Sequence, residues 1–139
     1  MTRREIRENL YIMLFRLEFH DKDDLSAQAE MCMEDMVGLR EKDRAELIGK
    51  FNGVVDNLDV IDAKIEQMAK GWTIGRIAKA ELTILRLAIY EIMYDENVPD
   101  SVAINEAIEL SKSYGGDKAS GFINGILSSV VRERSQETE

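Results

Sequence analysis

VAINEAIELSKSYGGDKASGFINGIL, residues 102–127, is the stretch that decides how the C-terminal half of this chain folds. Its first half predicts a helix, because apolar side chains recur at spacings of three and four residues. These side chains are Ala103, Ala107, Leu110 and Tyr114. Gly115 and Gly116 are expected to end that helix, since glycine readily adopts the left-handed conformation common at helix C-termini. Asp117 is then a suitable N-cap for a second helix.

The second half of the stretch predicts a helix with two different faces. The face expected to be buried carries Ala119, Phe122, Ile123, Ile126, Leu127 and Val130. The other face carries Gly121, Gly125 and Ser128, which leave the backbone nearly bare. Periodicity alone therefore indicates a helical hairpin of a packed bundle.

The composition favours one soluble all-α domain without catalytic or metal chemistry. The chain has 139 residues, 45 % of them hydrophobic, and Pro99 is its only proline. Cys32 and His20 are each the only residue of their kind, which excludes a disulfide framework and a Ser-His-Asp triad. No phosphate-binding or EF-hand loop is found, so neither metal nor cofactor is expected. No signal peptide or membrane-spanning run is found either, which predicts a cytoplasmic protein.

The net charge of −9 argues against nonspecific nucleic-acid binding over the whole surface. Basic residues nevertheless gather in two segments. The first contains Arg3, Arg4 and Arg7, and the second, residues 70–86, contains Lys70, Arg76, Lys79 and Arg86. The overall charge can therefore hide a basic face.

Residues 3–18 predict the first helix, which Thr2 and Glu5 begin with a capping box. Its core stripe consists of Ile6, Leu10, Met13, Leu14 and Leu17. A neighbouring stripe consists of Arg4, Arg7, Tyr11 and Phe15. Cations interleaved with aromatic rings suit single-stranded RNA, which offers both phosphates and bases. The alternative is that the rings pack on another helix while the arginines are solvated.

Residues 24–38, 42–69 and 78–94 predict three more helices. The second of them has a heptad pattern of Leu47, Phe51, Val54, Leu58, Ile61, Ile65 and Met68. A coiled-coil homodimer and an intramolecular bundle account for this pattern equally well. The helix over 78–94 is apolar on nearly every side and is expected at the centre of the domain. Its charged residues Glu81 and Arg86 should reach the surface or form ion pairs.

Two connections complete the expected helical chain. Trp72 and Ile74 are expected to anchor a short turn before residue 78. After residue 94, Asn97 or Asp100 is expected to cap the next helix.

Several segments together resemble the NusB family of transcription antitermination factors. They are VPDSVAINEAIELSKSYGG (98–116), GFINGIL (121–127), LRLAIYE (85–91) and RREIRENL (3–10). The resemblance implies an all-α fold of about seven helices in two packed subdomains, approximately 1–70 and 71–134, within one domain. It also implies a protein that is not an enzyme. Such a protein pairs with the small-subunit ribosomal protein acting as NusE and binds boxA RNA of nascent ribosomal RNA transcripts. It thereby joins the antitermination complex of RNA polymerase.

The resemblance also implies roles for individual residues. RNA contacts fall on Arg3, Arg4, Arg7 and Phe15 in the first helix, and on Tyr114, Lys118 and Phe122 around the glycine break. Glu81 is implied to contact the ribosomal partner. Asn124 is expected to be a buried amide that bonds to a neighbouring helix. Gly121 departs from the family pattern, which often has Lys or Arg there, and so removes one phosphate contact.

Two other functions compete with this interpretation of the sequence. One is the RNA-binding domain of a ribosomal RNA methyltransferase. The sequence has no cofactor loop and no nucleophilic-cysteine motif, which argues against this function. The other is a purely structural bundle that self-associates through the heptad seam of residues 42–69. A homodimer by itself does not separate these readings, because some family members are also implied to dimerise.

Overall fold

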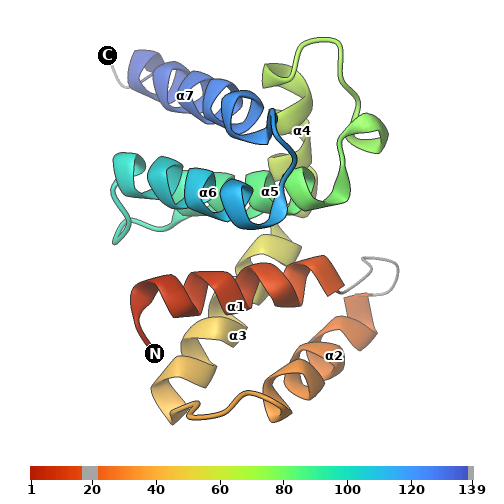
Figure 1. The fold of residues 1–139 in the computed structure, drawn as a ribbon, viewed down its shortest axis with the longest axis vertical. Helices are drawn as coiled ribbons and strands as arrows, with labels where there is room; N and C mark the ends of the chain where they lie inside the picture. Colours follow the sequence, from red (N-terminus) through yellow and green to blue (C-terminus); the bar gives the residue numbers. More distant parts are fainter. Residues whose placement is uncertain (17–21, 138–139) are drawn as a thin grey trace. The chain divides into compact units, whose positions relative to one another are not determined.

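The structure is a computed structural model that describes residues 1–16 and 22–137, and these residues form seven α-helices and one short 3-10 helix (Figure 1). The helices are α1 (Arg3–Arg16), α2 (Lys22–Glu34), α3 (Glu41–Asp56), α4 (Leu58–Met68), η1 (Ile74–Arg76), α5 (Lys79–Tyr94), α6 (Asp100–Tyr114) and α7 (Ala119–Glu137). The predicted all-α class with about seven helices is confirmed. The first helix begins at Arg3 as predicted, and its predicted end at residue 18, with Leu17, lies outside the described residues.

Backbone packing divides the chain into two units, Met1–Asp56 (unit 1) and Asn57–Glu139 (unit 2). This division lies earlier than the expected boundary near residue 70. The reason is that α4, which the sequence grouped with the N-terminal helices, packs against α5 and α7.

In unit 1, α1 and α2 pack against α3. The capping box at the start of α1 is present. The backbone N–H of Thr2 donates to Glu5 Oε1 at 3.0 Å, and the N–H of Glu5 donates to Thr2 Oγ1 at 3.1 Å. The core stripe of α1 is buried from Ile6 to Leu14, as expected. Helix α2 ends at Glu34, four residues before its predicted end, and Gly38 follows in a turn with a φ of 75°.

The predicted continuous helix over 42–69 is wrong, because Asn57 separates α3 from α4. Asn57 has φ −109° and ψ 14°, outside the helical region, although its carbonyl still accepts the N–H of Ile61 at 2.9 Å. The heptad pattern continues through this kink, so periodicity could not reveal it. Its main residues are fully buried within the chain: Leu47, Phe51, Val54, Ile61 and Ile65. A homodimer through this seam would have to expose that core.

In unit 2, α5 is the central helix and packs against α4, α6 and α7. Its residues Ile84, Leu85 and Ile89 are completely buried, as the sequence predicts. Arg86 forms a two-pronged ion pair with Asp62 of α4, with Nε–Oδ1 and Nη2–Oδ2 both at 2.8 Å. Arg86 therefore satisfies its charge through an ion pair, one of the two outcomes expected for it.

The α6–α7 hairpin is present and antiparallel, but its turn differs from the prediction (Figure 1). Gly115 has φ −95° and ψ 173°, an extended conformation, and Gly116 has no positive φ either. The expected left-handed conformation is therefore wrong for this turn. It occurs instead at Gly71, with a φ of 85°, after α4. Asp117 lies within the turn, two residues before α7 begins, and is not its N-cap.

Two other local expectations are corrected. Asn124 is exposed, and its Oδ1 accepts a hydrogen bond from Ser128 Oγ of the same helix at 3.4 Å. The apolar face of α7 is buried without needing a polar partner there, apart from Phe122, which is half-buried. The N-cap of α6 is Pro99 and neither Asn97 nor Asp100. Asp100 instead accepts a hydrogen bond from Arg134 of α7.

Asp62→Ala is expected to destabilise unit 2 by about 1–3 kcal/mol, because it removes two charge-assisted hydrogen bonds from a largely buried guanidinium. Urea unfolding followed by the fluorescence of Trp72, the only tryptophan, measures this. Glu109→Ala is the control, because it breaks an exposed ion pair with Lys112 and should change stability by less than about 0.5 kcal/mol. Equal effects of the two substitutions would contradict the prediction.

Candidate nucleic-acid interface

A groove of about 400 Å³ opens in unit 2 where the segment after α4 meets the start of α7. Its lining residues are Trp72, Arg76, Ile77, Ala78, Glu81, Gly116, Lys118, Ala119 and Phe122. Three residues predicted from the sequence, Glu81, Lys118 and Phe122, thus lie in one place. Tyr114 is 38 % exposed at the end of α6 and is not among the lining residues.

Two aromatic rings line the groove beside the apolar side chains of Ile77, Ala78 and Ala119. Trp72 and Phe122 meet edge to face, with ring centroids 6.0 Å apart and an interplanar angle of 68°. Trp72 is 49 % exposed, so much of its indole surface is open to a ligand. Such a surface can stack on a nucleobase or cover an apolar side chain of a protein.

Charged groups surround these rings. Arg76 and Lys118 are exposed cations on either wall, and Glu81 is a half-buried carboxylate at the start of α5. The cations can contact phosphates, whereas Glu81 can accept hydrogen bonds or pair with a basic residue. The groove therefore combines aromatic rings and cations, which suit RNA, with the carboxylate of Glu81, which would repel RNA phosphates.

The wall that carries Trp72 and Arg76 is built by short-range contacts. Gly71 turns the chain out of α4, and the N–H of Trp72 donates to the carbonyl of Ala69 at 2.8 Å. The N–H of Ile74 donates to the Glu66 carboxylate of α4 at 3.0 Å. These hydrogen bonds hold the backbone of this turn and of η1, and so fix the positions from which Trp72 and Arg76 extend.

Sequence reasoning missed Trp72 and Arg76 as members of a site. It assigned Trp72 only to a structural turn and counted Arg76 only within the basic segment 70–86. The available signal was the coincidence of the single tryptophan with that basic segment, directly after a helix-ending glycine.

The other predicted RNA contacts lie on α1 in unit 1 and are less uniform than the stripe suggests. Arg4 is exposed and Phe15 is half-buried, but Arg7 is 8 % exposed and Tyr11 is buried. The Tyr11 and Phe15 rings pack with centroids 5.9 Å apart. Tyr11 is therefore buried, as the packing alternative expects, but Arg7 is buried too and not solvated as that alternative expects. Arg4 keeps an exposed position suited to a phosphate contact.

Arg3 is 66 % exposed and forms an ion pair with Glu46 of α3. The hydrogen bond from Arg3 lowers the pKa of the Glu46 carboxyl below its ordinary value of 4.5, and partial burial opposes this effect. An RNA phosphate that contacts Arg3 must share this guanidinium with Glu46.

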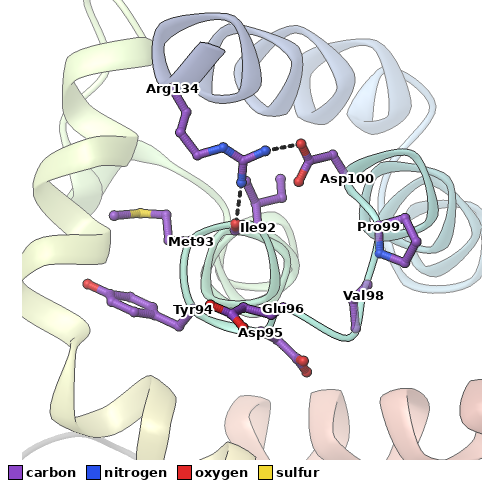
Figure 2. A pocket seen from close by; sticks show the side chains of 9 residues that line it. All are labelled: Ile92, Met93, Tyr94, Asp95, Glu96, Val98, Pro99, Asp100 and Arg134. Carbon is purple, nitrogen blue, oxygen red and sulfur yellow. Dashed lines mark hydrogen bonds and ion pairs between the residues drawn. The ribbon is translucent and has the colours of Figure 1, made fainter. Parts of the chain in front are cut away.

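A second hollow of about 460 Å³ lies at the other end of α5, and its chemistry is different. Figure 2 shows Arg134 of α7 reaching the carbonyl oxygen of Ile92, 2.6 Å away, and the carboxylate of Asp100. Asp95 and Glu96 also line this hollow. Because its cation is already bonded and its other charges are negative, this hollow is unsuited to phosphate.

Within residues 1–16 and 22–137, no group of three or more His, Cys, Asp or Glu side chains could hold a metal ion. None of the helices in this part of the chain is long and apolar enough to cross a membrane.

Comparison with known proteins decides the family. The model of the NusB family matches residues 4–132. The chain belongs to the NusB family. Its relative in Agathobacter rectalis, the transcription antitermination protein NusB, is 42 % identical over 127 residues, which are 91 % of this chain and 97 % of that protein.

Solved structures agree with this assignment. T. maritima NusB has a TM-score of 0.87 at 31 % identity and covers 96 % of this chain and 92 % of its own. A structure of antitermination factors NusB and NusE in complex with dsRNA has a TM-score of 0.82 and covers 94 % and 96 %. Its identity is 21 %, so this likeness shows the NusB-like fold alone.

Membership of the NusB family confirms the resemblance, the fold and the general function expected from the sequence. The chain is a transcription antitermination protein, that is, a non-enzymatic RNA-binding protein. This assignment favours antitermination over the methyltransferase alternative.

The Arg3–Glu46 pair predicts a pH dependence of unit 1. Because the folded-state pKa of Glu46 is lowered, its contribution is fully present above the ordinary value of 4.5 and is lost as pH falls below it. Urea unfolding at pH 6.5 and at pH 3.5 should therefore show a larger loss in the native protein than in Glu46→Gln. The difference should stay below about 1 kcal/mol, because the arginine is exposed. Identical losses in both proteins would show that the pair contributes nothing.

Proposed function

We propose that this chain promotes antitermination in the cytoplasm by binding boxA-type RNA of nascent ribosomal RNA transcripts together with the ribosomal protein NusE. The observation that carries the proposal is the groove in which Glu81, Lys118 and Phe122 meet Trp72 and Arg76. The structure of a NusB with NusE and dsRNA supports the choice of both partners. The resulting complex would act on the transcribing RNA polymerase.

Within this proposal, different side chains contact the RNA phosphates, the RNA bases and NusE. Arg3 and Arg4 of α1, together with Lys118, supply contacts to phosphates, whereas Arg7 at 8 % exposure offers little surface to a phosphate. Phe15, Tyr114 and Phe122 supply ring surfaces for bases. Glu81 faces a basic group of NusE. Trp72 and Arg76 extend the RNA surface beyond the residues that the sequence indicated.

The net charge of −9 limits what the chain can do alone. Only a few cations are available for phosphate contacts, and each contact adds to both the affinity and its dependence on salt. A basic ribosomal partner would contribute the missing cations. Cooperative binding of RNA by the pair therefore follows from the charge distribution.

A gel shift with boxA-type RNA, run with and without NusE, tests the function. We expect weak binding by the chain alone, at least about tenfold tighter binding with NusE, and a strong decrease with salt. A scrambled RNA is the control, and light scattering of the same samples measures any homodimer. Equal affinities with and without NusE would refute the cooperative proposal.

Two substitutions should separate RNA binding from NusE binding. Arg4→Ala should weaken RNA binding and reduce the slope of log affinity against log salt by about 0.7, while NusE binding is kept. Arg132→Ala, which removes an exposed cation of α7 outside the groove, is its matched control. Glu81→Lys should weaken NusE binding first, because it inverts the charge at the proposed protein contact. Unchanged affinity for NusE in calorimetry would remove Glu81 from that contact.

A further inference from the structure

The position of the second wall of the groove depends on how closely α7 approaches α6. This wall is the turn of residues 115–118 and the first turn of α7, which carry Lys118 and Phe122. Phe122 holds its edge-to-face contact with Trp72 only if α7 begins at this place. The contacts that fix the turn therefore also fix the groove.

Gly115 lies at a tight point of the turn, whereas a Cβ added at Gly116 would meet nothing within 4 Å. A Cβ added there would lie 2.7 Å from the Cβ of Ala119 and 2.8 Å from the carbonyl oxygen of Ser111. Carbon atoms pack best at about 3.5–4.0 Å, so neither neighbour tolerates this approach. The Ser111 carbonyl already accepts the N–H of Gly115 at 2.8 Å, and Ala119 is buried, so both neighbours are fixed.

A pair of hydroxyl groups joins the two helices beside this point. Ser111 is 1 % exposed, and its Oγ donates to the carbonyl of Ile108 at 2.6 Å. Ser111 Oγ also lies 2.7 Å from Ser120 Oγ of α7. Since a hydroxyl has one proton and Ser111 uses it within α6, Ser120 must donate to Ser111. This bond holds α7 against α6 in one register.

We propose that Gly115, Ser111 and Ser120 are positioning residues for the groove. Gly115 allows α7 to start close to α6, and the Ser120–Ser111 hydrogen bond keeps it there, so that Phe122 meets Trp72 and Lys118 borders the opening. The proposal rests on the proposed function only in taking NusE and RNA as the ligands of the groove.

Gly115→Ala tests the proposal because the added methyl group must push α7 away from α6. Trp72 is the only tryptophan, so its near-ultraviolet circular dichroism reports directly on the contact with Phe122. We expect a changed Trp72 band, unchanged helical content and an affinity for NusE and boxA RNA about tenfold weaker, as when one anchor of an interface is displaced. Gly125→Ala is the control, because an added Cβ there meets nothing within 4 Å and the residue lies outside the groove.

Ser120→Ala is the second variant and keeps the test decisive if Gly115→Ala fails to fold. It removes the inter-helix hydrogen bond without adding volume and should change the Trp72 band in the same direction by a smaller amount. Ser113→Ala, on the exposed side of α6, is its control. A Trp72 band and affinities equal to those of the native protein, even with lowered stability, would overturn the proposal. A changed Trp72 band in a protein that never binds NusE or RNA would support positioning and reject the proposed function.

Discussion

The burial of α5 is the constraint on which unit 2 depends. A helix that is apolar on nearly every side is stable in water only when other helices cover it on every side. α4, α6 and α7 provide this cover. The polar side chains of α5 need partners within this packing: Thr83 donates to the Lys79 carbonyl of α5 itself, and others need a partner on another helix. Arg86 meets this requirement through Asp62, and the start of α5, where packing opens, is where Glu81 borders the groove. The site is thus located where the cover of the central helix ends.

The groove shows how an acidic protein can still present a surface for RNA. The charge of −9 is spread over the chain, but short turns bring Arg76 and Lys118 beside two aromatic rings. Electrostatic attraction to a phosphate acts over about 8–10 Å at ordinary salt concentrations. The local arrangement of charges therefore matters more for RNA binding than the net charge of the protein. The contrast with the second hollow, where Arg134 is bonded to Asp100 and to a carbonyl, supports this view.

The sequence predicted the helices well because their apolar periodicity is strong, and it indicated only some of the residues that line the groove. Positions such as Ile84, Leu85 and Ile89 lie in the core as expected. The kink at Asn57 was missed because the heptad pattern runs through it, and the role of Gly115 was misread because the constraint is a close contact and not a backbone angle. Asn124 was wrongly placed in the interior, since a polar residue inside an apolar motif can also lie on the exposed face. Trp72 and Phe122 are 50 positions apart, and no local pattern could show that their rings meet.

The bond from Arg134 to the carbonyl of Ile92 has a consequence for how the chain folds during its synthesis. Unit 1 contains its core within the first 56 residues and can fold as soon as these leave the ribosome. Unit 2 folds later, because Arg134 of α7 supplies the bonds to the carbonyl of Ile92 at the end of α5 and to Asp100 at the start of α6. Until α7 is translated, the apolar surface of α5 remains partly uncovered and open to association with other chains. The order of the helices along the chain therefore makes the last helix the one that completes the C-terminal core.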